Sequence, residues 1–267
     1  MSRIIHVLGI DPQEDFANPN GALFVPGADD DMSRVAAMFR ANGHKIADVH
    51  ITLDCHNYND IAHPSWFVDS SGAHPAPFMI VSADDLESGR WMTRVPSLRG
   101  RTLEYLRALD ASGRYPHMIW PPHCLIGSSG CAVVPELMDA LNEWCKTHFG
   151  VINWVSKGSN VFTEHFSGVQ AEVPDPNDPT TQVNTDLVLA LEEADDILLV
   201  GEALSHCLAN TVRDIAANFS DPALIAKLVL LTDASSPVTG CEQFATDFIN
   251  EMTPKGMRTS TTVDFFA

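Results

Sequence analysis

The chain has 267 residues, of which 45% are apolar, so it can bury the core of one large α/β domain. Its 16 basic and 35 acidic residues give a formal net charge of −19 at pH 7. We expect no nucleic-acid or membrane partner, because binding to phosphates needs clusters of basic residues. No apolar run approaches the roughly 18–20 residues of a membrane span, and we expect a soluble, cytoplasmic protein.

Six cysteines are spread along the chain, and no Cys-x-x-Cys pair occurs among them. This spacing is unlike that of a disulfide framework or a structural zinc site, so we expect reduced thiols. We interpret most of them as small apolar core residues.

Short apolar runs alternate with amphipathic stretches along the chain. In chain order we expect a strand at 4–10, a helix at 32–41, a strand at 47–53, helices at 103–109 and 134–149, a strand at 151–155, a helix at 185–193, a strand at 197–200, a helix at 207–218, a strand at 228–232, a helix at 243–252 and a strand at 261–265. This alternation predicts a three-layer α/β/α fold with a mainly parallel central sheet. We expect a single domain over residues 1–267.

Two stretches interrupt the alternation. Residues 64–119 form a long insertion with one clear helix, and residues 158–183 form an irregular loop with three prolines. Long connections in compact domains are usually lids, binding loops or oligomer contacts. The insertion therefore offers a surface for self-association into a homo-oligomer.

The residues that follow the expected strands are the candidates for chemistry, because ligands of open α/β sheets bind beyond the carboxyl ends of the strands. Asp11 ends the first strand, Lys157 follows the strand at 151–155, and Cys207 opens the helix after the strand at 197–200. A helix N-terminus favours a thiolate, which makes Cys207 a candidate nucleophile. Taken singly, each has an ordinary alternative: a packed cysteine, a turn-capping aspartate and a solvent-exposed lysine.

The second expected strand ends in Asp54-Cys55-His56. The Asp-x-His spacing puts both side chains on one face of a strand, about 6–7 Å apart, which suits two ligands of one ion. His63 and His123 are candidates to complete a first-row metal site. The alternative for each histidine is an ordinary core or surface position.

Five segments combine these residues in one order. They are 10–16 (IDPQEDF), 54–56 (DCH), 120–124 (WPPHC), 157–158 (KG) with 164–168 (EHFSG), and 201–207 (GEALSHC) with Thr211. Together they resemble the motifs of the nicotinamidase/pyrazinamidase branch of the isochorismatase-like cysteine hydrolases. The resemblance follows the family's order and spans residues 7–211.

The resemblance implies an Asp-Lys-Cys triad. Cys207 would be the nucleophile, Asp11 the general base, and Lys157 the residue that holds Asp11 and stabilises developing charge. The resemblance also implies a cis peptide bond between Glu202 and Ala203, with the amides of Ala203 and Cys207 forming an oxyanion hole.

For the metal, the resemblance implies Asp54, His56 and His123 as ligands of a divalent ion. His63 is the expected fourth protein ligand, and Asp60 is its rival, directly or through water. Zinc is the expected ion, although iron and manganese also fit a mixed His/Asp/water site.

The substrate implied by the resemblance is a small amide. Phe16, Trp120 and Phe166 are expected around its ring, with Glu202 and Ala203 beside it, and ordinary core packing is the alternative for the three aromatic side chains. The implied reaction is hydrolysis of nicotinamide to nicotinate and ammonia through a cysteine thioester, a step of NAD salvage, with the metal orienting the pyridine nitrogen. The alternatives are the same triad acting on an N-carbamoyl or maleamate-like amide, and a non-catalytic metal-binding protein or scaffold.

Overall fold

The structure is a computed structural model that describes residues 3–267, so residues 1 and 2 of the expected domain lie outside it. Six parallel strands form the central sheet, in the spatial order β5 (Asn153–Lys157), β2 (Ile46–Asp54), β1 (Ile5–Ile10), β6 (Asp196–Gly201), β7 (Leu228–Leu231) and β8 (Arg258–Ser260). None of the helices among the described residues combines the length and the apolar character of a membrane span.

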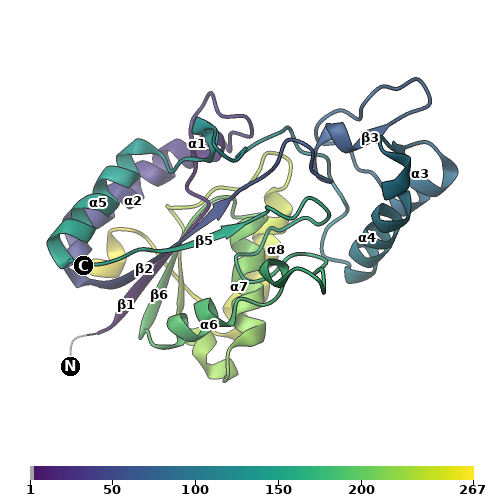
Figure 1. Cartoon of the computed structure of the whole chain (residues 1–267). Coiled ribbons are helices and arrows are strands. Elements are labelled where there is room, and N and C mark those ends of the chain that lie inside the picture. The colour runs from purple at the N-terminus through teal and green to yellow at the C-terminus, as the bar shows by residue number, and fades with distance from the viewer. Residues whose placement is uncertain (1–2) are drawn as a thin grey trace.

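Helices cover both faces of this sheet, which confirms the three-layer α/β/α fold (Figure 1). On one face α2 (Ala28–Asn42) packs against α5 (Pro135–His148), and a short helix α1 (Glu14–Ala17) lies near them. On the other face lie α6 (Thr185–Glu192), α7 (Cys207–Asn218) and α8 (Glu242–Met252).

The order of the strands reverses between β1 and β6. The chain runs from β1 outward through β2 to β5, and then from β6 outward through β7 to β8. Both central strands are buried at every residue, which explains their nearly continuous apolar sequences. Gly201 has a φ of 103°, and a Cβ there would overlap the Ile10 carbonyl, so the ends of β1 and β6 approach closely. The crevice beyond such a reversal is the usual ligand site of an open α/β sheet.

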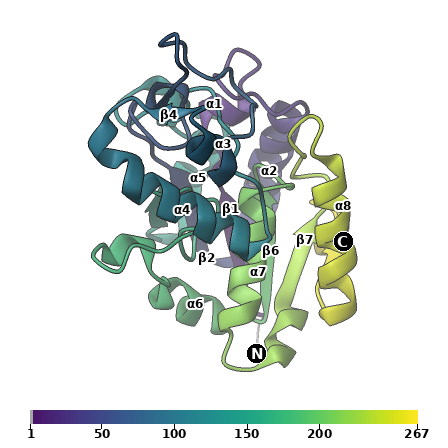
Figure 2. The ribbon, with the colours of Figure 1, turned by 90° about the vertical axis from the view of Figure 1, so that its right-hand side faces the viewer.

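The insertion at 64–119 carries more structure than the sequence predicted. It contains two helices and a two-stranded antiparallel sheet: α3 (Ala83–Ser88), α4 (Arg99–Ser112), β3 (Phe67–Val68) and β4 (Met92–Thr93). The one-helix prediction missed α3, although Ser82 and Asp85 form a capping box at its start. These elements enclose an apolar cluster of their own and form the lobe that faces the viewer in Figure 2. Self-association through this lobe stays a prediction.

Two strand predictions need correction. The strand expected at 261–265 is wrong, because β8 lies earlier, where it pairs with β7. Thr262 instead donates its N–H and hydroxyl to the Asp233 carboxylate, and residues 264–266 form a 3₁₀ turn. The strand expected at 151–155 begins two residues later and ends on Lys157. Strand-like composition locates a strand only where a neighbouring strand offers pairing.

Candidate active site

Three residues at the ends of strands and one at the start of a helix meet beside the reversal of the sheet. Asp11 directly follows β1, Asp54 and Lys157 are the last residues of β2 and β5, and Cys207 is the first residue of α7. Asp54 and Lys157 are register partners on adjacent strands. All four side chains are buried. The structure therefore brings together the three residues of the expected triad and the first expected metal ligand.

Lys157 lies at the centre of this group. Its Nζ is 2.8 Å from Asp11 Oδ2 and 3.1 Å from Asp54 Oδ1. The same nitrogen is 3.6 Å from Cys207 Sγ and donates to the His165 carbonyl at 3.0 Å. One ammonium group thus links a candidate base, a candidate nucleophile and a candidate metal ligand.

Burial and charge together set the protonation states. Burial raises the pKa of Asp11, and the Lys157 charge and the Thr52 hydroxyl, which donates to Oδ1 at 2.5 Å, lower it only in part. Burial would lower the pKa of Lys157, but Asp11 and Asp54 raise it well above its ordinary value. Burial raises the pKa of the Cys207 thiol well above its usual range, and the Lys157 charge lowers it only in part. The resting site therefore holds an ammonium and a thiol, with Asp11 placed to accept a proton.

Three expected metal ligands lie next to the triad. Asp54 Oδ2 is 3.0 Å from Nε2 of His56 and 3.3 Å from Nε2 of His123, and one ligand atom from each residue lies within 4.8 Å of the others. The ring of His63 is centred 5.2 Å from that of His56 and 5.5 Å from that of His123. Burial would raise the pKa of Asp54, but His56 and Lys157 hold it well below its ordinary value, so its carboxylate is ionised.

The outer contacts of these imidazoles fit a metal site. Nδ1 of His56 lies 3.2 Å from an Asp60 oxygen, and Nδ1 of the other two histidines contacts backbone carbonyl oxygens at 2.9 and 3.2 Å. Such contacts orient metal-binding histidines and leave Nε2 free. Nε2 of His63 is buried and has no hydrogen-bond partner among residues 3–267. Because Asp60 contacts Nδ1 of His56 and not Nε2, the geometry favours His63 over Asp60 as a fourth ligand.

A small cavity opens beside Cys207. The expected substrate-binding residues Phe16, Trp120, Phe166 and Ala203 line it. The other lining residues are Leu23, Asp54, His123, Glu164, His206, Cys207 and Val238. The Phe166 ring stands perpendicular to Trp120, with the ring centres 6.4 Å apart. Mainly apolar and aromatic walls with a few polar groups suit a flat, uncharged ring.

Two polar residues of this lining were missed by the sequence argument. The Glu164 carboxyl group accepts from Trp120 Nε1 at 3.2 Å, and burial raises the pKa of Glu164 to about 8. Burial lowers the pKa of His206 to about 4. At neutral pH the cavity therefore presents a protonated carboxyl group and a neutral imidazole. Both residues lie inside the segments that carry the resemblance, which was the available signal.

The backbone before Cys207 follows the expected arrangement. The peptide bond between Glu202 and Ala203 is cis, which confirms that prediction. The amides of Ala203 and Cys207 donate no hydrogen bond to other groups in the described part of the chain, so both are available to an oxyanion. Glu202 differs from its expected substrate-binding role: its carboxylate accepts from the Ser236 N–H at 3.1 Å, and its side chain is not part of the cavity wall.

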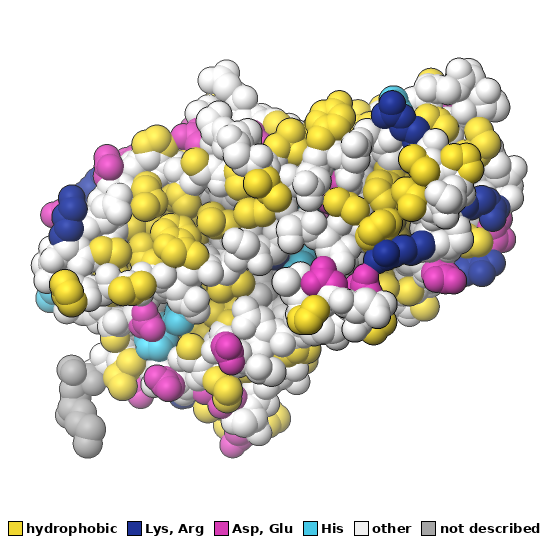
Figure 3. Space-filling model, in the orientation of Figure 1, with side chains coloured by type: hydrophobic (Ala, Val, Ile, Leu, Met, Phe, Trp, Pro, Cys, Tyr) yellow, Lys and Arg dark blue, Asp and Glu magenta, His cyan; other side chains and the backbone are white. Residues whose placement is uncertain are grey.

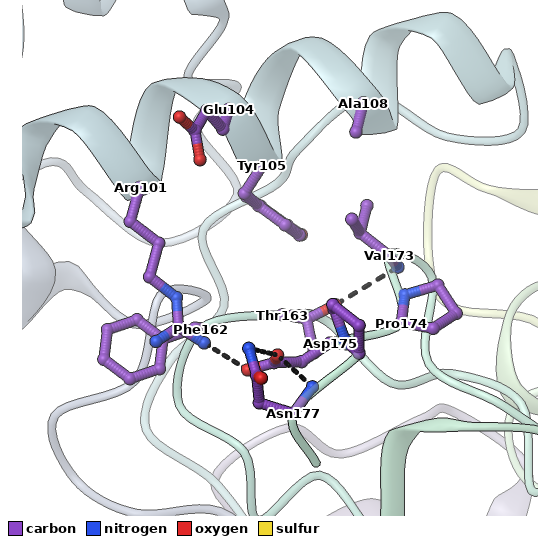
Figure 4. Close-up of a pocket in the computed structure, with 11 residues that line it drawn as sticks. Arg101, Glu104, Tyr105, Ala108, Phe162, Thr163, Val173, Pro174, Asp175 and Asn177 are labelled. Atoms are coloured by element: carbon purple, nitrogen blue, oxygen red, sulfur yellow. Dashed lines mark hydrogen bonds and ion pairs between the residues drawn. The ribbon is translucent and has the colours of Figure 1, made fainter. Parts of the chain in front are cut away.

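A second cavity, of about 520 Å³, lies between α4 and the loop at 158–183 (Figure 4). The guanidinium of Arg101 stacks over the Phe162 ring, 3.5 Å from its centre, and pairs with Asp175 at 2.5 Å. The insertion thus packs against the loop that carries Glu164, which connects it to the wall of the first cavity.

No family model matches the chain, and no curated protein matches its sequence. Solved structures are similar over nearly the whole chain. The yeast nicotinamidase bound to the inhibitor nicotinaldehyde is 17% identical with a TM-score of 0.67, over 97% of this chain and 100% of that chain. A nicotinamidase/pyrazinamidase of Acinetobacter baumanii is 18% identical with a TM-score of 0.64, over 98% of each chain. A pyrazinamidase of Pyrococcus horikoshii in complex with zinc is 19% identical with a TM-score of 0.57, over 96% of this chain and 98% of that chain. At these identities the likeness shows that the chain shares their fold.

Proposed function

We propose that the chain is a metal-dependent amidohydrolase of the nicotinamidase branch, which converts nicotinamide to nicotinate and ammonia in NAD salvage. The observation that carries this proposal is the position of Lys157 Nζ. It forms ion pairs with Asp11 and Asp54 and lies 3.6 Å from Cys207 Sγ, next to a cluster of histidines. The fold shared with nicotinamidases over nearly the whole chain supports the same assignment.

In the first step the Cys207 thiol gives its proton to Asp11, and the sulfur attacks the amide carbonyl carbon. The amides of Ala203 and Cys207 donate to the oxyanion that forms. Asp11 then passes its proton to the leaving nitrogen, the C–N bond breaks, and ammonia departs from a thioester. The Lys157 ammonium keeps Asp11 in place during both proton transfers.

The second step regenerates the site. Asp11, again a carboxylate, takes a proton from a water molecule whose oxygen attacks the thioester carbonyl carbon. The C–S bond breaks, the proton returns from Asp11 to the sulfur of Cys207, and the carboxylic acid is released and ionises to nicotinate by losing its proton to water. The cycle consumes one amide and one water and produces one acid and one ammonia.

Asp54, His56, His123 and His63 are the residues that would hold the metal. A divalent ion there would supply Lewis acidity beside the reacting carbonyl and a position for the pyridine nitrogen of the substrate. Zinc suits these donors, and one similar pyrazinamidase is a complex with zinc. Iron and manganese are the other ions that such a His/Asp set accepts.

The cavity wall favours nicotinamide over the alternative amides. Among the residues that the structure describes, no lysine or arginine lines the cavity. The carboxylate of a maleamate-like substrate would therefore depend on the proposed metal ion or on Lys157 for a positive partner in this mainly apolar cavity. An uncharged aromatic amide needs no such partner.

Ammonia release from nicotinamide by the purified protein tests the proposal, with Cys207→Ala and with a chelator. Cys145→Ala is the matched control, because Cys145 is a half-buried cysteine on α5, outside the cavity wall. We expect Cys207→Ala to abolish release, the chelator to weaken it and Cys145→Ala to leave it unchanged. Release only from N-carbamoyl or maleamate-like amides would overturn the substrate. Release from no amide by folded protein would favour the non-catalytic alternative.

A further inference from the structure

Two histidines and an aspartate meet on β1 and β2, away from the candidate active site. His6 lies in β1, and Asp48 and His50 lie in β2. His6 and Asp48 are register partners, and Asp48 and His50 are two residues apart, so all three side chains share one face of the sheet. His50 precedes Asp54 by four residues, which at about 3.3 Å per residue places the two clusters about 13 Å apart along the strand.

The distances within this cluster match those of a tetrahedral metal site. His50 Nε2 lies 3.3 Å from His6 Nδ1 and 3.8 Å from Asp48 Oδ2. One ligand atom from each residue lies within 4.8 Å of the other two. A tetrahedral zinc ion with Zn–N bonds of about 2.0–2.1 Å separates two ligand nitrogens by about 3.3–3.4 Å. The two imidazole nitrogens are therefore already at the spacing that one ion requires.

The cluster combines two buried imidazoles with one carboxylate that is open to solvent. His6 and His50 are 5% and 1% exposed, whereas the Asp48 side chain is 42% exposed. Figure 3 shows histidine side chains beside acidic ones at the surface over β1 and β2, at the lower left of the view. A cation could thus enter from the side of Asp48.

A neighbouring strand provides an outer contact for the buried histidine. Asn153 is the register partner of His50 on β5, and its Nδ2 lies 3.1 Å from His50 Nδ1. As placed, this NH₂ group donates to Nδ1. An exchange of the amide oxygen and nitrogen, which have nearly the same shape, would let the oxygen accept from Nδ1 and leave Nε2 free for a metal. Outer contacts of this kind orient metal-binding histidines.

We propose that His6, Asp48 and His50 bind a second divalent cation of the zinc type, with water as its fourth ligand. The ion would tie β1 to β2 at a place that the hydrolysis does not use, so the proposal does not depend on the proposed function. The competing explanation is a plain hydrogen bond between the two imidazoles, which needs no ion. The N···N distance of 3.3 Å fits a long hydrogen bond as well as two ligands of one ion, so the zinc measurement decides between the two explanations.

Zinc content per chain tests the proposal, measured after equilibration of the full chain with zinc and removal of the unbound metal. Asp48→Asn and His50→Gln remove one ligand each, and Asp54→Asn removes a ligand of the candidate active site. The matched control is Glu193→Gln, because the exposed Glu193 acts on His6 through its charge alone. We expect His50→Gln to lose one equivalent of zinc, and Asp48→Asn to bind that equivalent at least tenfold more weakly. Glu193→Gln should keep it.

Asp54→Asn separates this proposal from the proposed function, because it should affect only the other equivalent of zinc. Asp48→Asn keeps the oxygen that accepts from the Val49 N–H at 2.8 Å, so we expect this variant to fold. It tests the second site even where His50→Gln does not fold. Unchanged zinc content and affinity in Asp48→Asn would overturn the second site. An equal loss in Asp48→Asn and Glu193→Gln would also overturn it, because surface charge rather than ligation would then explain the binding.

Discussion

Replacing Lys157 by methionine removes a buried ammonium that contacts two carboxylates, Asp11 at 2.8 Å and Asp54 at 3.1 Å. Lys157 is 2% exposed, so water cannot take the place of its charge. Removing one partner of a buried ion pair typically costs about 3–5 kcal/mol, because the remaining charge is left uncompensated. We expect the free energy of unfolding of Lys157→Met to fall by this amount at pH 8, together with loss of ammonia release.

The size of this loss should depend on pH. Burial already raises the pKa of Asp11, and removing the Lys157 charge raises it further. A carboxyl group whose pKa is raised by folding stabilises the fold in acid, and this contribution is lost as the pH rises through the raised pKa. Acid protonates Asp11 in the variant and removes the uncompensated charge. The deficit should therefore be smaller at pH 5 than at pH 8.

Urea unfolding at pH 5 and pH 8 measures this loss, in chelator so that no metal ion compensates Asp54. The control is Lys157→Met combined with Asp11→Asn, which removes one of the uncompensated carboxylates. This double variant should recover part of the stability but none of the activity. A loss below about 1 kcal/mol for Lys157→Met at pH 8, the size expected for an exposed pair, would refute the reasoning. So would a loss of equal size at both pH values.

Three further predictions concern the metal site and the cavity. His63→Asn should weaken zinc binding more than Asp60→Asn does. Asp60→Asn should lower the zinc affinity about 10–100-fold, because Asp60 orients His56. Equilibrium dialysis measures both affinities, and a larger loss in Asp60→Asn would make Asp60 the ligand. The pKa of Glu164 is raised to about 8, so Glu164 contributes a fall in the free energy of unfolding as the pH rises from about 5 to 9, and Glu164→Gln should make this slope shallower. Parallel pH curves of the two proteins in urea unfolding would contradict this prediction. Phe16→Ala should raise KM for nicotinamide about 10–100-fold by removing an apolar wall, and a fall in kcat alone would show that Phe16 does not contact the ring.

Much of the candidate site could be predicted from the sequence because its residues stand at the ends of strands and at the start of a helix. Asp11 and Asp54 each end an apolar run, and Cys207 begins an amphipathic one. Apolar runs and helical periodicity depend on residues close together in the chain, so they locate strand ends without any tertiary structure. Parallel strands then bring those ends to one edge of the sheet.

Prediction from local sequence failed where the position of a strand or a side chain depends on a partner from elsewhere in the chain. The strand expected at 261–265 found no neighbour, whereas Arg258–Ser260 did. Glu202 lies in the motif next to Cys207, yet its side chain turns to the amide of Ser236 and away from the cavity. Burial, which raises the pKa of the Cys207 thiol, is likewise set by surrounding segments and not by the helix start alone.

The sequence by itself determined the layered fold, the order of the strand-end motifs and the identity of the triad candidates. The tertiary structure decided which groups face each other: Nε2 of His63 is left without a partner among the described residues, Asp60 contacts Nδ1 of His56, and His50 meets His6 across two strands. The physical reason is that register and burial arise from packing between segments more than forty residues apart, as with His6 and His50. Such contacts leave no periodic trace in either segment alone.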